Sequence, residues 1–408
     1  MRQMKDSGIE WIGKIPEDWA IERMKSLFTE RNERDCKGRT LLSVSQFWGI
    51  RPKSETDIAD SHIAESYDDY KEVYQGDFVM NIMLAWNGSY AVSEYDGMVS
   101  PAYCVFKFRK DCCKKYFHYL LRTNGYPTAF KTMSRGVIDS RLRLYPEQFY
   151  TFPIIIPSID EQQRIADYLD ENCGEIDSLI GLQEQMIEKM KAYKQSVITE
   201  AVTKGLDPNA KLVPSGIDWI GEIPEHWDII KVGFIFDNLD NLREPISAEM
   251  RERNNPQYDY YGASGVIDKI DHYNVDDKVL LIGEDGANLV MRNLPLIYKA
   301  EGKFWVNNHA HILKPRKDDY DFMAHALEAC NYRDYITGSA QPKLSQENLS
   351  RVQLPVPPLS EQQAIASYLD SKCSDIDRLI ALKQQKIESL KDYKKSVIYE
   401  AVTGKTIV

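Results

Sequence analysis

An internal repeat constrains this chain more than any other feature of its sequence. The segment Asp6–Trp19 returns as Pro214–Trp227, and Ile156–Gly205 returns as Val356–Lys405 with roughly 28 of 50 aligned residues identical. The sequences between these copies are nearly unrelated. An order of frame, variable region, frame and variable region predicts one pseudo-symmetric scaffold that presents two different surfaces. Such a scaffold suits a protein that reads two things at a fixed separation.

The composition indicates a globular protein with more than one domain. The 408 residues are 43% hydrophobic, which is enough for two or more domains to bury cores of their own. The seven cysteines are an odd number without C-x-x-C spacing, so neither a disulfide framework nor a zinc knuckle is expected, and a reducing cytoplasm fits best. No apolar run approaches the length of a membrane span, and the first residues lack a signal region. We therefore expect a soluble protein.

Each copy of the longer repeat predicts a helix of about 40 residues, near 60 Å in length at about 1.5 Å per residue. Asp160 and Ser360 are the expected N-caps. Gly205 and Gly404 follow the last apolar turn and are expected to end the two helices. Helices of this length are too long to be buried in one compact domain.

Apolar residues recur at alternating spacings of three and four within both helices, which predicts a coiled-coil seam. The predicted seam residues of the first helix are Leu169, Cys173, Ile176, Ile180, Ile187, Met190 and Val197. Those of the second helix are Leu369, Cys373, Ile376, Ile380, Ile387, Leu390 and Val397. Polar residues interrupt the seam at equivalent places, among them Lys194 and Lys394, a device that fixes register and partner.

The seam has two possible partners. The helices could pair between two copies of the chain, but tethering raises the effective concentration of the two copies within one chain and favours intramolecular pairing. Further apolar residues widen the stripe beyond a two-helix seam. They are Tyr168, Leu179, Leu182 and Tyr193, with their counterparts Tyr368, Leu379, Leu382 and Tyr393. This additional apolar face is expected to contact another protein.

The variable regions are expected to be α+β domains of one fold. Short alternating apolar runs predict strands at Val73–Met83, Tyr103–Phe108, Val279–Ile282 and Phe304–Leu313, and helices are predicted at Lys114–Arg122 and Phe322–Tyr335. Both regions close with matching sequences, Arg143–Pro157 and Lys343–Pro357. The expected boundaries are 1–157 for the first domain, 158–205 for the first long helix, 206–357 for the second domain and 358–408 for the second long helix.

Charge is distributed unevenly along a chain whose net charge is −11. Lys107–Arg143 carries about +8, directly after Ser54–Cys104 at about −9, and Gly286–Lys317 carries about +5. The net charge alone argues against nucleic acid as a partner, whereas the basic stretches favour it. Solvated surface charge is the alternative explanation for each stretch.

No catalytic or metal-binding motif survives inspection. Asn255-Pro256-Gln257-Tyr258 lacks the second proline of an adenine methyltransferase motif, and no glycine-rich loop opens a helix after a strand. Asp285 with Glu301 could serve a magnesium-dependent nuclease, although Glu-Gly-Lys between two strand-like runs is more simply a turn. His309 and His311 lie on one strand face without an evident third metal ligand. The chain is therefore predicted to be a reader and not an enzyme.

Several of these segments together resemble the specificity (S) subunit of type I restriction–modification systems. They are the repeated PSGIDWIGEIPEHW, the helix entry PPLSEQQAIASYLD, the helix exit YKKSVIYEAVTGK and the joining sequence ITEAVTKGLDPNAKLVPSG. The resemblance covers both frame copies, about 130 residues, and the order of parts along the chain. It implies two similar α+β target-recognition domains, separated by two long helices that pair as an intramolecular antiparallel coiled coil with pseudo-two-fold symmetry.

The resemblance also implies partners and a role in phage defence in a bacterial or archaeal cytoplasm. Each recognition domain would read one half of a split double-stranded DNA target, and the helices would act as a ruler for the unread spacer. Two methyltransferase (M) subunits would dock on the frame and carry S-adenosylmethionine, so that this chain itself binds no cofactor. Motor-nuclease (R) subunits would complete the restriction enzyme. A self-contained methyltransferase or nuclease, and a purely structural adaptor, are the competing hypotheses.

Candidate DNA contacts follow from residue chemistry within the variable regions. Arg135 lies between small residues and is favoured for guanine recognition, because its guanidinium can donate two hydrogen bonds to one base edge. The other candidates in the first domain are Lys131, Ser134, Arg141, Arg143, Trp86 and Asn87. In the second domain they are Tyr261, Asn307, Asn308, His309, Gln341 and Lys343. The second region totals about −8, so the isolated chain is expected to bind DNA weakly and to depend on M subunits for positive charge.

Overall fold

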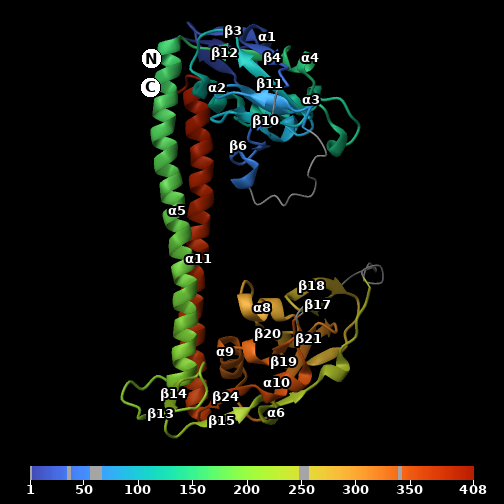
Figure 1. Ribbon diagram of the computed structural model, residues 1–408. Helices are drawn as coiled ribbons and strands as arrows, with labels where there is room; N and C mark the ends of the chain where they lie inside the picture. Colours follow the sequence, from blue (N-terminus) through green and yellow to red (C-terminus); the bar gives the residue numbers. More distant parts are fainter. Residues whose placement is uncertain (1, 35–37, 56–66, 248–256, 339–341) are drawn as a thin grey trace. The chain divides into compact units, whose positions relative to one another are not determined.

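The computed structural model describes residues 2–34, 38–55, 67–247, 257–338 and 342–408 (Figure 1). The chain divides into two compact units. The first unit comprises Met1–Gln183 and Gln385–Val408, and the second comprises Glu184–Gln384. Each unit therefore contains one variable domain together with part of each long helix.

The elements of the first unit follow in chain order. They are β1 (Met4–Asp6), β2 (Lys14–Pro16), β3 (Ala20–Arg23), α1 (Met24–Leu27), β4 (Phe28–Arg31), β5 (Leu42–Ser45), β6 (Gly49–Pro52), η1 (Lys53–Glu55), β7 (Lys71–Val73), β8 (Phe78–Asn81), η2 (Ala85–Asn87), β9 (Tyr90–Val92), β10 (Gly97–Val99), β11 (Tyr103–Phe108), α2 (Lys114–Leu121), α3 (Gly125–Met133), η3 (Asp139–Arg141), α4 (Pro146–Phe149), β12 (Pro153–Ile156) and the start of α5 (Ile159–Lys204).

The second unit begins and ends with the same elements of the frame but differs between them. Its elements are β13 (Leu212–Pro214), β14 (Glu222–Pro224), β15 (Asp228–Lys231), α6 (Val232–Ile235), β16 (Phe236–Asn238), η4 (Asp240–Leu242), β17 (Tyr258–Gly262), β18 (Gly265–Ile270), β19 (Val275–Gly283), α8 (Gly286–Met291), β20 (Ile297–Val306), β21 (Ala310–Pro315), α9 (Tyr320–Ala329), η5 (Arg333–Tyr335), β22 (Ile336–Thr337), β23 (Lys343–Leu344), α10 (Gln346–Arg351), β24 (Gln353–Val356) and the start of α11 (Leu359–Val402).

The two domains share one fold, as predicted from their matching ends. The first has a sheet in the order β4-β11-β8-β9, and the second has the order β16-β21-β19-β20-β17-β18. In the first domain β5 and β6 form a separate hairpin, whereas the equivalent hairpin β17–β18 joins the large sheet. In each unit a strand before the variable region pairs with the strand that leads into the long helix, β3 with β12 and β15 with β24.

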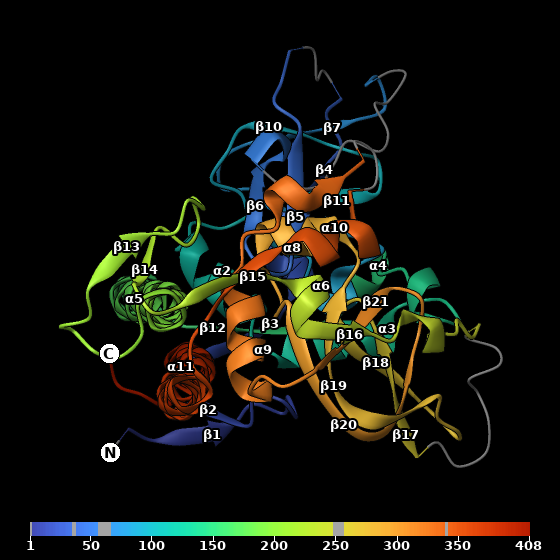
Figure 2. The same cartoon turned by 90° about the horizontal axis from the view of Figure 1, so that it is seen from below.

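The large sheet of each domain has one central strand that is buried on both faces. Phe78 and Met80 of β8 face a core shared with α2 and α3, while Val79 faces a smaller core under the β5–β6 hairpin. In the second domain Leu280 and Ile282 of β19 face α9, while Val279 and Leu281 face the other side of the sheet. Figure 2 shows α9 beside α11, next to the sheet of the second unit. Alternate residues of one strand thus stabilise two cores.

Two predicted strands are wrong in extent. Val73–Met83 is divided into β7 and β8, because Asp77 Oδ2 accepts a hydrogen bond from the backbone N–H of Tyr74 (3.0 Å) and closes a turn. Phe304–Leu313 is likewise divided into β20 and β21, because Asn307 Oδ1 accepts a hydrogen bond from the backbone N–H of His309 (2.8 Å). In both places a short polar side chain satisfies the backbone locally and ends the strand.

Each long helix begins one residue before its predicted cap. Asp160 and Ser360 lie inside α5 and α11, and the backbone N–H of Glu161 donates a long hydrogen bond to Ser158 Oγ (3.4 Å). The predicted N-caps are therefore wrong. Gly205 directly follows α5 with a positive φ of 76°, a conformation that favours glycine and ends the helix there.

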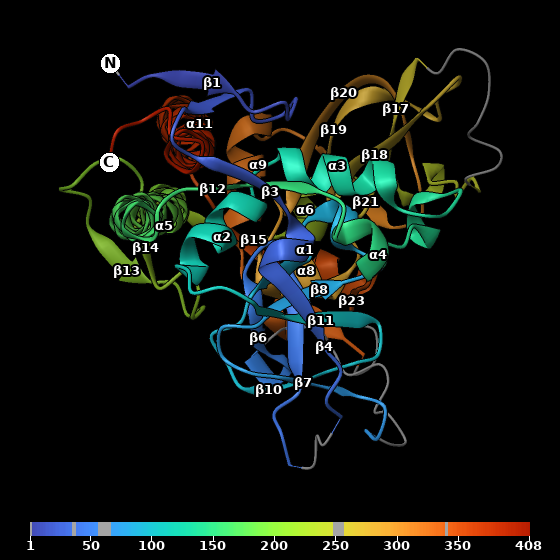
Figure 3. The same ribbon diagram turned by 90° about the horizontal axis from the view of Figure 1, so that it is seen from above.

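Within each unit the two long helices pair antiparallel. In the first unit Lys394 Nζ lies 2.7 Å from Asp177 Oδ2, and in the second Lys194 Nζ lies 2.6 Å from Asp377 Oδ2. These ion pairs are related by the internal repeat, and they explain how lysines at seam positions fix the register of the pair. Viewed along their axes, α5 and α11 lie side by side (Figure 3).

The seam residues face between the helices. Leu169, Cys173, Ile176, Ile187, Val197, Leu369, Cys373, Ile376, Ile387 and Leu390 are buried, and Ile180, Met190, Ile380 and Val397 are half-buried. None of the helices in the described ranges has the length and apolar character that crossing a bilayer requires.

Candidate nucleic-acid interface

The same backbone ladder occurs at the end of the central strand in both domains. In the first, the N–H of Ile82 donates to Ala102 O (3.1 Å) and the N–H of Leu144 donates to Ile82 O (2.9 Å). In the second, the N–H of Glu284 donates to His309 O (2.9 Å) and the N–H of Leu344 donates to Glu284 O (2.9 Å). We call these two places the strand-end sites. Each site joins the segment after the central strand, the loop before β11 or β21, and the loop before α4 or α10.

Most of the predicted DNA contacts lie on or beside the strand-end sites. Arg143 and Lys343 immediately precede Leu144 and Leu344, and so occupy equivalent positions in the two domains. His309 is itself a member of the second site, and Asn307 adjoins it. The sequence did not show that these residues share one backbone framework, because the hydrogen bonds that align them connect distant segments.

In the first domain an arginine loop projects from the strand-end site. Arg135 and Arg143 exchange backbone hydrogen bonds of 2.9 Å in both directions, and Arg141 lies in η3 between them. A Cβ on Gly136 would lie 2.5 Å from Arg141 O, so only glycine allows this closed loop. Arg135 and Arg141 are exposed, and the structure describes no ion pair for either. Their guanidinium groups are thus available to a ligand.

The loop also carries apolar groups that were not predicted as contacts. Val137 at its tip is 99% exposed, and Ile138 beside it is also exposed. Ser134, at the base, donates its hydroxyl to Phe130 O (2.7 Å), which ties the loop to the end of α3. Apolar atoms next to arginines suit a groove surface, where they can contact thymine methyl groups.

Trp86 and Asn87 lie in η2, just after β8, and their side chains are fixed within the domain. Trp86 Nε1 donates to Met83 O (3.0 Å), and Lys131 Nζ lies 5.0 Å from the centroid of the indole ring. Lys131 also pairs with Asp139 (2.8 Å). Asn87 Oδ1 accepts a hydrogen bond from the Ser89 hydroxyl (2.7 Å). These contacts make Trp86 and Asn87 parts of the support for the loop, with little freedom to reorient.

An exposed aromatic pair adjoins η2 and was missed by the sequence reasoning. Phe47 and Trp48 form the tip of the β5–β6 hairpin, and Phe47 is 79% exposed. A Cβ on Gly88 would lie 3.7 Å from Gln46 Cβ, so the tip packs against the end of η2. The signal in the sequence would have been two adjacent large aromatic residues close to a basic residue, a combination that is typical of nucleic-acid contacts.

The basic stretch 107–143 does not form one surface. Lys110 pairs with Glu22 (2.6 Å), Lys115 pairs with Asp170 of α5 (2.5 Å), and Arg109 donates to Phe28 O (2.9 Å). These residues hold the domain together or attach it to the long helix. These basic residues are therefore engaged within the first unit, whereas Arg135 and Arg141 of the arginine loop are exposed.

In the second domain the predicted residues surround the turn between β20 and β21. Asn307 is buried, and its backbone N–H donates to Tyr261 O of β17 (3.0 Å), while Asn308 and His309 are exposed. A Cβ on Gly283 would lie 2.3 Å from Ala263 O, which shows how closely the β17–β18 hairpin approaches the site. Gln341 lies outside the described residues. The structure thus brings Tyr261, Asn307, Asn308 and His309 together with the strand-end site.

The charged groups of this site are already paired. Glu284 lies 3.4 Å from Lys343 Nζ and 3.5 Å from Arg243 Nη1. Arg243 also donates to backbone oxygens, including Asp240 O (3.2 Å). Neither Arg243 nor Glu284 was among the predicted contacts. Because both cations are paired with Glu284, neither can contact a phosphate without weakening that pair.

His311 is buried in β21, next to the turn between β20 and β21, and does not form a metal site with His309. Its Nδ1 lies 2.6 Å from Asp240 Oδ2 and its Nε2 lies 2.8 Å from Leu344 O, so both ring nitrogens already contact groups of this domain. Burial opposes ionisation of Asp240, but the hydrogen bonds from His311 and the Ile312 N–H hold the pKa of that carboxyl below its usual range. Among the described residues, no group of three or more His, Cys, Asp or Glu could hold a metal ion.

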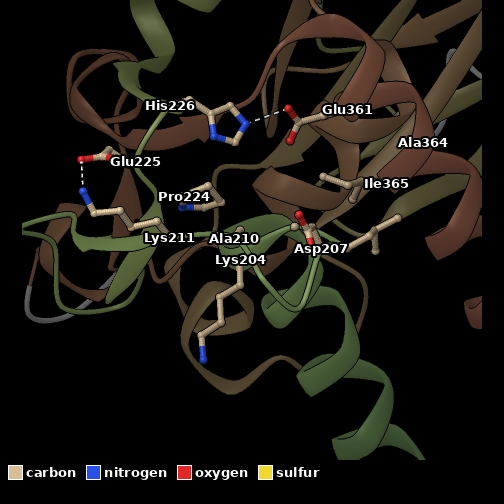
Figure 4. A pocket seen from close by; sticks show the side chains of 12 residues that line it. Lys204, Asp207, Ala210, Lys211, Pro224, Glu225, His226, Glu361, Ala364 and Ile365 are labelled. Carbon is tan, nitrogen blue, oxygen red and sulfur yellow. Dashed lines mark hydrogen bonds and ion pairs between the residues drawn. The ribbon is translucent and has the colours of Figure 1, made fainter.

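A pocket of about 580 Å³ lies away from the strand-end site of the second unit. It is formed by the segment that follows α5, the end of β14 and the first turns of α11 (Figure 4). His226 Nε2 lies 2.7 Å from Glu361 Oε1, and Lys211 pairs with Glu225 (2.7 Å) at its edge. All of these residues belong to the repeated frame and the segment that joins its copies, so the pocket is part of the scaffold and not of a recognition surface.

The long helices carry a second exposed feature, an apolar stripe outside the seam. Leu179, Leu182 and Tyr193 are 47%, 53% and 61% exposed, and Leu379, Leu382 and Tyr393 are 44%, 55% and 59% exposed. The near-identical exposure of equivalent residues gives each long helix the same apolar face. Exposed apolar groups that recur on one helix face favour contact with another protein.

Comparisons with known proteins match both halves of the chain. The family model described as the type I restriction modification DNA specificity domain matches residues 16–191 and 224–392. The MjaVIII type I restriction enzyme specificity subunit of Methanocaldococcus jannaschii is 23% identical over 96% of this chain and 94% of its own length. The EcoprrI specificity subunit of Escherichia coli is 31% identical over 29% of each chain.

Two solved structures have a similar fold. A chain from a study of complex assembly and conformational transition of the type I R-M system superposes with a TM-score of 0.71 at 16% identity, covering 96% of this chain and 99% of the other. The HsdS subunit from Thermoanaerobacter tengcongensis superposes with a TM-score of 0.50 at 16% identity, covering 96% and 98%.

Proposed function

The chain belongs to the family of type I restriction–modification DNA specificity subunits, which are non-catalytic, and we propose that its two domains read the two halves of one asymmetric DNA target. The observation that carries the proposal is the pair of strand-end sites, which combine one backbone framework with different side chains. Ile82, Ala102 and Arg143 in the first site correspond to Glu284, His309 and Lys343 in the second. Two sites of this kind would read different base sequences in the same manner.

The paired helices would hold these readers at a set distance along DNA. The repeated ion pairs Lys394–Asp177 and Lys194–Asp377 support this role, because they lock the register within each unit. A fixed register gives a fixed length, and DNA advances about 3.4 Å per base pair along each strand. The unread spacer between the two half-sites would then have a constant number of base pairs.

Catalysis would come from partner subunits. We expect S-adenosylmethionine on M subunits that methylate adenine, and DNA cleavage in motor-nuclease subunits. A chain that transferred methyl groups by itself is the competing hypothesis. Incubating the purified chain with labelled S-adenosylmethionine and target DNA distinguishes the two: label on DNA without any M subunit would contradict the proposal.

The apolar stripes are the proposed docking faces for two M subunits, one on each helix. Replacing Leu182 and Leu382 by aspartate should weaken binding of M subunits at least about tenfold, because a charge would be buried in an apolar contact. Both side chains are exposed, so the free chain should keep its melting temperature. Size-exclusion chromatography with light scattering measures the assembly.

The matched control for this pair is Lys191→Asp with Lys391→Asp, which places one aspartate on an exposed position of each long helix outside the stripe. It should assemble like the wild type. Equal assembly of the Leu182→Asp, Leu382→Asp variant would show that the stripe is not the docking face.

Arg135 should be the most sensitive single position of the first recognition domain. Arg135→Ala should lower methylation of the native target by about 10- to 100-fold and relax the preference at one base pair, since a bidentate arginine–guanine contact contributes about 1–3 kcal/mol. Arg23→Ala, which removes the same charge from an exposed position of the same domain, should have little effect. Methylation of an oligonucleotide set with every base at each half-site position measures both. A uniform loss over all bases would assign Arg135 to phosphate contacts instead.

The isolated chain should bind DNA weakly and with strong salt dependence. The second domain carries about −8 overall, and its strand-end lysine is already paired with Glu284. A gel-shift assay with and without M subunits tests this. Tight and sequence-selective binding by the purified chain would mean that the recognition domains need no added positive charge.

A further inference from the structure

Gln162 and Gln362 make the same buried contacts at equivalent positions of the two long helices. Gln162 is 3% exposed and Gln362 is 2% exposed, although both are polar and lie in the first turn of a helix. Gln162 Nε2 donates to Pro157 O (2.9 Å), and Gln362 Nε2 donates to Pro357 O (2.9 Å). Each amide is thereby fixed in orientation by the strand end that leads into its own helix.

The other side of each amide contacts the variable domain. Gln162 Oε1 accepts a hydrogen bond from the backbone N–H of Cys113 (3.0 Å), and Gln362 Oε1 accepts one from the backbone N–H of Asp319 (2.7 Å). Cys113 and Asp319 are the N-cap residues of α2 and α9, the helices that pack beside α5 and α11. One side chain therefore connects the entry to each long helix with the start of the neighbouring domain helix.

These contacts depend little on the sequence of the variable domain. A backbone N–H is present at an N-cap whether the residue is cysteine or aspartate. The hydrogen bond that Gln162 accepts from Cys113 comes from the backbone and does not involve the cysteine side chain. Gln362 makes one additional bond, to Asp318 Oδ1 (2.9 Å). The same attachment can thus hold two domains that have almost no sequence in common.

Neighbouring contacts between helix and domain are specific to each half. Asp170 bonds to Lys115 (2.5 Å) and Tyr119 (2.8 Å), whereas its equivalent Asp370 lies 2.9 Å from His325 and 3.5 Å from Lys299. The repeated Glu161 and Glu361 accept hydrogen bonds from the indoles of the repeated Trp19 and Trp227, which joins frame to frame. Among the contacts named here, the glutamine amide alone joins frame to domain by the same groups in both halves.

We propose that Gln162 and Gln362 are positioning residues that fix the angle of each recognition domain on its long helix, and so set how strictly the spacer length is read. This inference rests on the proposed function, because it assigns the glutamines a part in the ruler. Loss of the amide would leave a buried N–H and a buried carbonyl oxygen without their partners, so the bonds that hold the domain against the helix would be lost and the domain could tilt. A tilted domain would accept half-sites at neighbouring spacings.

The experiment measures spacing discrimination by the assembled complex with M subunits. DNA duplexes carry both half-sites at the native spacer, one base pair shorter and one base pair longer, and the readout is the ratio of methylation rates. Gln162→Ala and Gln362→Ala should each reduce the preference for the native spacer at least about tenfold, with both half-site sequences unchanged. Gln162→Glu keeps an acceptor for the Cys113 N–H and should retain more of the preference, which also serves if the alanine variant assembles poorly.

A purely structural role is separated by a control in the core of the same domain. Ile154→Val, at a fully buried position of β12, should lower the melting temperature without altering the ratio. An unchanged ratio in the glutamine variants, or an equal change in Ile154→Val, would overturn the inference while leaving bipartite recognition intact. A wild-type complex that methylates all three spacings equally would overturn the ruler itself, and this inference with it.

Discussion

Exchanging residues 20–143 for the same region of another family member will replace one half of the DNA target and leave the other half unaltered. The arginine loop, with Arg135 and Arg143, lies within this region, whereas the second strand-end site lies outside it. Methylation at the original first half-site should fall by about a thousandfold or more, the usual ratio of specific to non-specific binding. Methylome sequencing of cells that express the chimera measures both half-sites and the spacer.

The structure explains why the frame should accept a new domain. Strand β3 pairs with β12 through backbone hydrogen bonds, and Gln162 contacts the domain through a backbone N–H, so both attachments are retained for any domain of the same fold. The ion pair of Lys115 with Asp170 would be lost, but an exposed pair contributes only about 0.2–1 kcal/mol. A chimera that alters the second half-site would contradict independent reading by the two domains.

Lengthening both long helices by three heptads will lengthen the spacer and leave each half-site unchanged. The insertions belong after Gln183 in α5 and after Ile387 in α11, which lie opposite each other in the register of the Lys394–Asp177 pair. Three heptads add about 31 Å of helix and keep the seam continuous. This length corresponds to about nine base pairs, close to one turn of B-DNA, so both readers would face similar sides of the duplex.

Two further variants make this test sharper. The same insertion in α5 alone would move the seam residues out of register with α11, and methylation should be lost. One heptad in both helices corresponds to about three base pairs, which turns one half-site away from its reader, and methylation should fall at least about tenfold. If methylation continues at the original spacing in the doubly lengthened variant, the helices do not measure the spacer.

The sequence was sufficient to predict the scaffold. Repeated apolar residues such as Leu169 and Leu369 at spacings of three and four determine the seam, and the repeat places both helices in one chain. Lys194 and Lys394 at seam positions indicated a register device, and each is paired with an aspartate of the other helix. These features are local or periodic, so they can be recognised without knowledge of long-range contacts.

Single polar groups decide the geometry at several places where the sequence pattern predicts something else. The strands predicted at Val73–Met83 and Phe304–Leu313 are each interrupted by a polar side chain. The side chains of Asp77 and Asn307 accept hydrogen bonds from nearby backbone N–H groups and end the strands there. The capping interpretation of the two helix entries likewise missed Gln162 and Gln362, whose amides are buried against the variable domains. Their repetition was visible, but the partners lie more than forty residues away in the chain, at Cys113 and Asp319.

What the amino-acid sequence by itself determined is the plan of the molecule: two different domains of one fold, two long helices with one seam, and a frame that occurs twice. Only the tertiary structure decided which side chains share a surface, because the strand-end sites are assembled by backbone hydrogen bonds between Ala102, Ile82 and Leu144, and between His309, Glu284 and Leu344. Periodicity encodes which face of an element is buried, whereas contacts between distant loops depend on how the whole sheet closes. The physical reason is that a repeat is visible in the spacing of neighbouring residues, whereas a DNA-contacting surface is formed by residues that are far apart in the sequence.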